Sequence, residues 1–198
     1  RATALREEAL ELLEPITRGE GKSSEGYLLK ASALRELNRD LDRCDWLLKQ
    51  ARKTTDKRGD RINRIRIERA LLGVMNGDLD KSESVLRELM AKDMSNARIF
   101  MALATVLEGR QQYIPAHAEL LRAMERTAPN SLARREVEAH LARLQAVIEA
   151  QAAGAVIPAP TPAKSATDEP AVADHNRVIR RKKGKAAAEE APVEAAAE

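Results

Sequence analysis

A turn followed by an amphipathic helical pattern recurs along this chain at spacings of 38 and 34 residues, and this recurrence limits the fold more than any other feature. The turns are RDL at 39–41, GDL at 77–79 and QQY at 111–113. After each turn come a small residue, then a leucine, then alanine or leucine, at Cys44, Leu48 and Ala51, at Ser82, Leu86 and Leu89, and at Ala116, Leu120 and Ala123. Small residues let two helices approach while leucines fill the space between them. The pattern predicts a series of helical hairpins.

Composition supports an all-α fold and limits the classes of function. Aromatic residues make up only 2% of the chain against 43% hydrophobic residues, so the core must come from aliphatic side chains that favour packed helices. The net charge of +3 is the difference between 34 basic and 31 acidic residues, which by itself does not indicate nucleic-acid binding. Cys44 is the single cysteine, which excludes an intrachain disulfide and predicts a buried, inert thiol. No apolar run reaches about 18 residues, so no transmembrane segment is expected.

The character of the sequence changes near residue 151. Up to this point apolar residues recur at helical spacing, whereas 152–198 is rich in proline, alanine and small polar residues. We therefore predict a disordered tail over 152–198, which includes a basic cluster at 177–185.

The repeat spacing and its residues resemble the tetratricopeptide-repeat (TPR) family, whose units of about 34 residues each hold two helices. The match is closest at Phe100, Leu103, Ala104 and Leu107, on the family pattern W-x2-L-G-x2-Y, followed by Tyr113, Ala116, Leu120 and Ala123. The resemblance implies a right-handed α-solenoid of antiparallel helix hairpins. Repeats are expected at 25–62, 63–96 and 97–130, after the second helix of an incomplete repeat at 1–24 and before a capping helix at 131–151.

The sequence departs from the family pattern at and before its second repeat, and its amino end carries two further features. Arg66 and Arg69 stand where the second repeat should carry large apolar residues, and the segment KTTDKRGDR adds about four residues before it. Pro15 is expected to kink or end the first helix because proline lacks an amide donor. The incomplete first repeat also leads us to expect that the natural protein continues upstream of Arg1.

A groove lined by the first helix of each hairpin is the candidate binding surface that the resemblance implies. The residues expected to face it are Leu29, Ala33, Glu36, Leu37, Arg64, Ile67, Leu71, Val74, Arg98, Met101, Thr105 and Glu108. Apolar residues at the centre with charges of both signs at the margins suit a peptide or helix of a partner protein. The alternative is that several of these residues simply pack between repeats.

Motifs for catalysis, metal binding or cofactor binding are not found. The chain has no glycine-rich phosphate loop, no nucleophile elbow and no helical H-x-x-x-H pair. His117, His140 and His175 are expected to be surface histidines. We therefore predict a protein with no cofactor, no metal and no catalytic residue that acts as an interaction scaffold, with the cytoplasm as the favoured compartment. The alternative of a non-catalytic end of a larger enzyme stays open.

Two basic clusters offer a second alternative, binding to nucleic acid or to an anionic surface. Segment 52–69 holds eight basic and three acidic residues, and it is either a patch for an acidic partner or nucleic acid, or a solvated loop with local pairs to Asp56, Asp60 and Glu68. The tail cluster could tether RNA, anionic lipid or an acidic protein, or only increase solubility. Its basic residues are Arg177, Arg180, Arg181, Lys182, Lys183 and Lys185.

Overall fold

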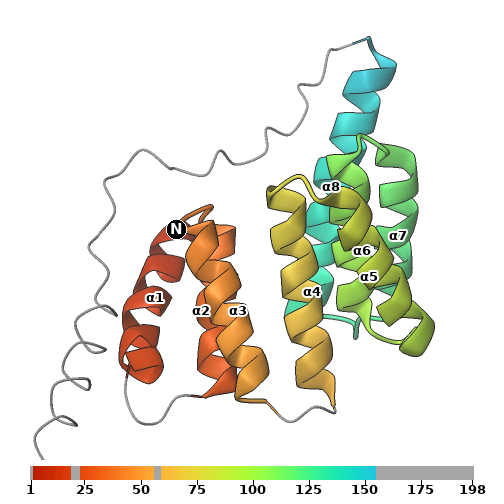
Figure 1. Ribbon diagram of the computed structural model, residues 1–198. Coiled ribbons are helices and arrows are strands. Elements are labelled where there is room, and N and C mark those ends of the chain that lie inside the picture. Colours follow the sequence, from red (N-terminus) through yellow and green to blue (C-terminus); the bar gives the residue numbers. More distant parts are fainter. Residues whose placement is uncertain (1, 19–22, 56–58, 155–198) are drawn as a thin grey trace, which may run out of the picture. The chain divides into compact units, whose positions relative to one another are not determined.

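The computed structural model describes residues 2–18, 23–55 and 59–154, and this part of the chain contains eight α-helices and no strand (Figure 1). The helices are α1 (Ala2–Arg18), α2 (Ser24–Glu36), α3 (Leu41–Lys53), α4 (Asp60–Met75), α5 (Leu79–Lys92), α6 (Ala97–Gly109), α7 (Tyr113–Glu125) and α8 (Leu132–Ala152). The predicted all-α class is confirmed for these residues. The predicted disordered tail starts at 152, which is the last residue of α8, and its residues 155–198, including the basic cluster at 177–185, lie outside the described residues.

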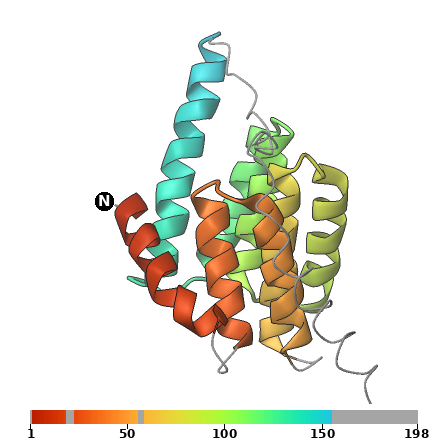
Figure 2. The same ribbon diagram turned by 60° about the vertical axis from the view of Figure 1, so that its left-hand side comes forward.

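Helices that follow one another in the chain pack on one another. Short turns make α2 and α3, α4 and α5, and α6 and α7 into antiparallel pairs, with α1 packed on α2 and α8 packed on α7 (Figures 1 and 2). The first helices of the pairs also meet, because α2 contacts α4 and α4 contacts α6. Helices α2, α4 and α6 therefore form one row.

Side-chain caps explain where several helices begin. The Ser23 hydroxyl accepts a hydrogen bond of 2.9 Å from the Gly26 amide, and Ser131 caps α8 through the Arg134 amide at 3.1 Å. Such caps satisfy amides that have no partner within the helix. Pro15 was expected to kink or end the first helix, and α1 continues through Pro15 to Arg18. Pro15 therefore does not end the helix.

The small and leucine positions after each turn are buried, as the sequence predicts. All nine of these residues are at most 3% exposed. One group of core side chains lies around α2 and α3 and a second around α5, α6, α7 and α8, and α4 contributes to both through Ile65 and Ile67. Cys44 is buried, as predicted. Burial is the main reason that the pKa of its thiol rises to about 11. Helix α4 is thus the joint between the two groups.

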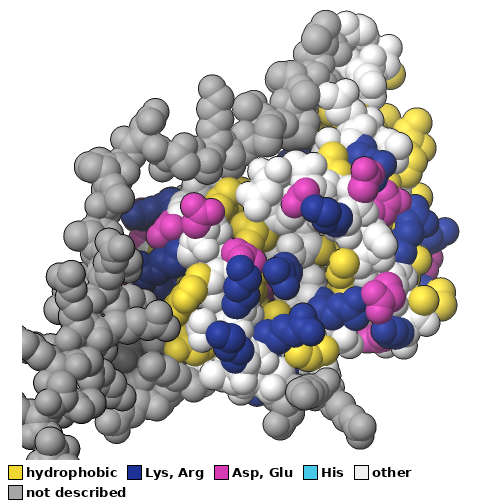
Figure 3. Space-filling model, in the orientation of Figure 1, with side chains coloured by type: hydrophobic (Ala, Val, Ile, Leu, Met, Phe, Trp, Pro, Cys, Tyr) yellow, Lys and Arg dark blue, Asp and Glu magenta, His cyan; other side chains and the backbone are white. Residues whose placement is uncertain are grey.

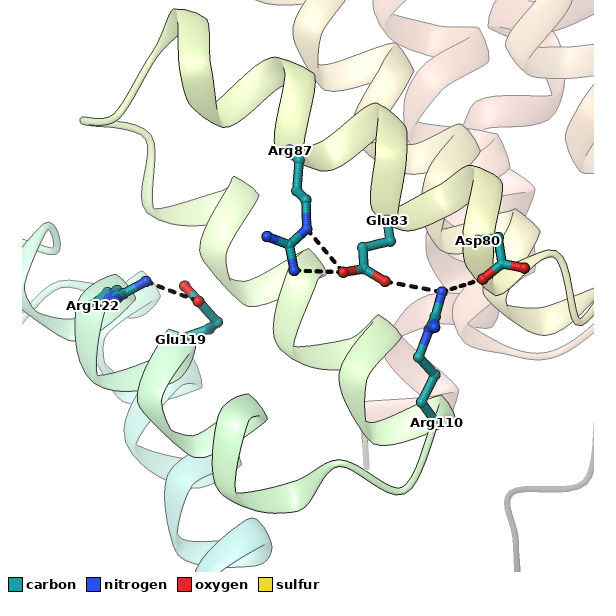
Figure 4. Close-up of polar contacts among 6 residues, drawn as sticks. All are labelled: Asp80, Glu83, Arg87, Arg110, Glu119 and Arg122. Carbon is teal, nitrogen blue, oxygen red and sulfur yellow. Dashed lines mark hydrogen bonds and ion pairs between the residues drawn. The ribbon is translucent and has the colours of Figure 1, made fainter.

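Charged side chains gather on parts of the face on which α3, α4 and α5 lie. Lysine and arginine side chains form a band across this face (Figure 3). A network of ion pairs joins the end of α6 to α5 (Figure 4). The guanidinium of Arg110 pairs with the carboxylate of Asp80 and lies 2.9 Å from that of Glu83. Arg87 donates to the same Glu83 carboxylate at 2.6 and 2.8 Å. This network ties the turn before α7 to the preceding helical pair.

Candidate functional site: a cleft along α2, α4 and α6

A cleft of about 390 Å³ runs along the row of α2, α4 and α6 and is flanked by α8. Each helix of the row contributes residues that are three or four positions apart, which places them on one side of that helix. The lining residues are Leu28, Leu29, Ser32, Arg35, Glu36, Arg64, Ile67, Glu68, Leu71, Arg98, Met101, Ala102, Thr105, Glu136 and His140.

Eight of the twelve residues expected to face a groove line this cleft. They are Leu29, Glu36, Arg64, Ile67, Leu71, Arg98, Met101 and Thr105. Ala33, Leu37, Val74 and Glu108 are not among the lining residues. Seven lining residues were not among those expected, namely Leu28, Ser32, Arg35, Glu68, Ala102, Glu136 and His140. The last two come from α8, and no local signal indicates that this helix lies beside the row.

The centre of the cleft is apolar. Leu29 is 43% exposed and Leu71 and Met101 are half-buried, whereas Ile67 is only 4% exposed and belongs to the core. Ile67 therefore supports the cleft from behind, in line with the alternative that some of the expected residues pack between helices. The half-exposed side chains leave an apolar strip that reaches solvent.

Charged groups surround this strip, and several are already paired. The Arg35 guanidinium donates to the Glu68 carboxylate at 2.9 Å, and both side chains are largely buried. Near the start of α4, Arg64 pairs with Glu25 at 2.9 Å while its Nε atom is buried without a hydrogen-bond partner. The charges at the margins are thus held in place by neighbouring helices.

Glu108 connects α6 to α8 beside the cleft. Its carboxylate contacts the imidazole of His140 and accepts a 2.7 Å hydrogen bond from Arg143. Burial by itself raises the pKa of Glu108, but the hydrogen bonds and charges of His140 and Arg143 outweigh it and lower the pKa below the usual 4.5. His140 and His117, which were expected to be surface histidines, are both partly exposed, and His140 also contacts Glu108. His175 lies outside the described residues.

The tie between α6 and α8 is expected to weaken in acid. Because the pKa of Glu108 is lowered in the folded state, its contribution to stability is present above the ordinary pKa of 4.5 and is lost as the pH falls through the folded value. Glu108→Gln should lower the unfolding free energy by about 1 kcal/mol at neutral pH. Denaturant titrations of both proteins over a range of pH should show this difference shrinking below pH 4.5. A difference that is independent of pH would contradict this assignment.

The ion pairs that the structure describes for arginines of the basic segment 52–69 run between helices. Arg66 pairs with Glu88 of α5 at 2.7 Å, Arg69 with Asp45 of α3 at 3.5 Å, and Arg64 with Glu25 of α2. Within the described residues, Asp60 pairs with none of these arginines and Glu68 pairs with Arg35. The expected solvated loop with local pairs is therefore wrong for 60–69, because these residues belong to the helix α4. Asp56 lies outside the described residues.

In the described ranges, no three histidine, cysteine or acidic side chains are grouped so that they could hold a metal ion. No described helix combines the length and apolarity that crossing a membrane requires. No family model matches the chain, and neither a curated protein nor a solved structure matches it significantly.

Proposed function

We propose that this chain is a non-catalytic interaction module that binds a peptide or helix of a partner protein in the cleft. The proposal includes the finer fold assignment: the paired helices are TPR-like repeats of a right-handed α-solenoid, with α8 as the cap. Three observations support that assignment, namely the turn spacing, the buried small residues at the helix contacts and the row formed by α2, α4 and α6. In a solenoid, such a row provides an extended binding surface.

The observation that carries the proposed function is the solvent-accessible apolar strip of the cleft. Leu29, Leu71 and Met101 come from three different helices and are all at least partly exposed. A partner helix or extended segment could bury apolar anchors against them, while Glu36 and Arg98 at the margins meet its polar side chains.

A single charge in the strip should weaken partner binding by about tenfold or more without loss of the fold. Leu29→Asp places a carboxylate where an apolar anchor of the partner is expected to bind. Because this side chain is 43% exposed, the carboxylate can stay in contact with water and the fold should be kept. Leu132→Asp is the matched control, since Leu132 is 72% exposed at the start of α8 and does not line the cleft. Ile67→Asp is unsuitable because that side chain is buried.

The test is a selection of displayed peptides on the full-length chain, followed by affinity measurements on both variants and on Met101→Asp. We expect enriched peptides to carry apolar residues at helical or alternating spacing and to lose about tenfold or more in affinity on Leu29→Asp, but not on Leu132→Asp. Circular dichroism checks that both variants keep their helix content. Failure to enrich any peptide, or equal affinity for the two variants, would refute the cleft as the binding surface.

A further inference from the structure

Helix α4 presents two different faces to its surroundings. Arg64, Ile67 and Leu71 line the cleft described above. Residues two positions farther along a helix point to nearly the opposite side, because each residue turns the helix by about 100°. Arg66 and Arg69 are therefore directed away from the cleft, toward the side where α3 and α5 lie.

This second face of α4 is open. Two adjoining hollows of about 530 and 500 Å³ lie along it and share Arg52, Arg66 and Arg69. Helices α3 and α5 both pack on α4, and side chains of both helices line the hollows. We call the two hollows together the arginine groove. Helices α3, α4 and α5, which line it, are those on whose face the lysine and arginine side chains form a band (Figure 3).

The arginine groove has a marked excess of positive charge. Its lining includes five basic residues, Lys49, Arg52, Arg66, Arg69 and Lys81, against two acidic ones, Asp78 and Glu88. The hydrogen bonds and charges of Lys92 and Arg66 lower the Glu88 pKa to about 2, so this carboxylate stays ionised.

The ion pairs of the groove leave it able to take up further anions. Arg66 and Arg69 pair with Glu88 and Asp45, but these are partly exposed surface pairs, which contribute little and exchange readily. Arg52 has no ion pair with any residue that the structure describes. A planar guanidinium can bind a carboxylate through two parallel hydrogen bonds.

The groove also has apolar surface between its charges. Leu48, Ile62 and Ile65 line one hollow and Val85 lines the other. None of the described lining residues is aromatic, whereas nucleic-acid strands are commonly held by stacking on aromatic side chains. Apolar contacts beside arginines suit a segment that carries both carboxylates and aliphatic side chains. We propose that the arginine groove binds an acidic amphipathic segment of a partner protein.

The proposal accounts for the departure of this chain from the repeat pattern. Arg66 and Arg69 occupy positions where the resemblance implies large apolar residues that pack between repeats. In the structure they line an open groove between α3 and α5. Arginine at these positions replaces a packed contact by a surface with charge complementarity to acidic groups.

The test uses a fluorescein-labelled peptide with leucines at helical spacing and glutamates at the remaining positions. Its binding to the full-length chain is measured by fluorescence anisotropy. We expect binding that weakens with added salt, that falls about tenfold or more in the double variant Arg52→Glu/Arg69→Glu, and that is lost when glutamine replaces glutamate in the peptide. Arg135→Glu, an exposed arginine of α8 outside both sites, is the matched control.

Two further measurements separate this groove from the cleft and a protein partner from nucleic acid. Leu29→Asp should leave affinity for the acidic peptide unchanged, and a loss in that variant would mean that the peptide occupies the cleft. A labelled oligouridine should bind more weakly than the peptide. The proposal is overturned if the oligonucleotide binds more tightly through Arg52 and Arg69, or if the peptide does not bind at low salt.

Discussion

Phe100→Ala is expected to lower the free energy of unfolding by about 3–5 kcal/mol, a large part of the total stability of a domain of this size. Phe100 is the single phenylalanine of the chain and is 1% exposed, so alanine would leave a cavity among α5, α6 and α7. The Arg126 guanidinium also lies 4.3 Å from the centre of the ring. Its cation–π contact would be lost together with the apolar contacts.

Equilibrium unfolding in urea, followed by circular dichroism, measures this effect. Ile114→Ala is the control because Ile114 is 74% exposed on α7, and it should change stability by no more than about 0.5 kcal/mol. Since Phe100 adjoins Met101 in the sequence, its loss should also weaken peptide binding in the cleft. A loss below about 1 kcal/mol for Phe100→Ala would mean that this core is not packed as described.

Sequence patterns were sufficient for the helices and for about half of the residues that line the cleft. Turn residues such as the 77–79 segment end one helix and begin the next, and small residues such as Cys44 and Ala116 mark where helices touch. Once the first helix of each pair is known, its side toward the cleft follows from the helical period. Residues such as Leu29, Leu71 and Met101 could therefore be named in advance.

Features that depend on contacts between distant segments could not be predicted in this way. Glu108 was expected in the cleft, but α8 lies beside α6 and engages it through His140 and Arg143. The direction taken by α8 is set by packing on α7 and by its own buried residues, Val137 and Leu144. The arginine groove is a similar case. Its charge is visible in the sequence, but the open face of α4 is a property of how α3 and α5 pack.

The buried charge of Lys30 is the feature that sequence reasoning missed most clearly. This residue of α2 is 3% exposed, and its ammonium group pairs with Glu14 of α1 and lies 3.2 Å from the Thr17 hydroxyl. A lysine on a helix usually reaches solvent. Here α1 covers it, so the lysine becomes part of the contact between α1 and α2.

Removing Glu14 should lower the free energy of unfolding more than removing Lys30, the buried charge of the pair. Glu14→Ala leaves the Lys30 ammonium buried without its carboxylate, and we expect a loss of about 3 kcal/mol, at the lower end for a broken buried pair because the Thr17 hydroxyl remains. Lys30→Met fills the same space with an apolar side chain. The free energy of unfolding of Lys30→Met should stay within about 1 kcal/mol of the wild-type value. Glu14 is partly exposed in this variant too, and its carboxylate lies 3.6 Å from the guanidinium of Arg43.

Denaturant unfolding of the two variants tests this order, and hydrogen exchange locates the change. In Glu14→Ala the amides of α1 should exchange much faster, because this helix is held to the rest of the described chain mainly by α2. In Lys30→Met they should stay protected. The reverse order, with Lys30→Met the more damaging change, would contradict the view that Glu14 is needed mainly to compensate the buried ammonium of Lys30. Equal and small effects would mean that α1 does not cover Lys30 in solution.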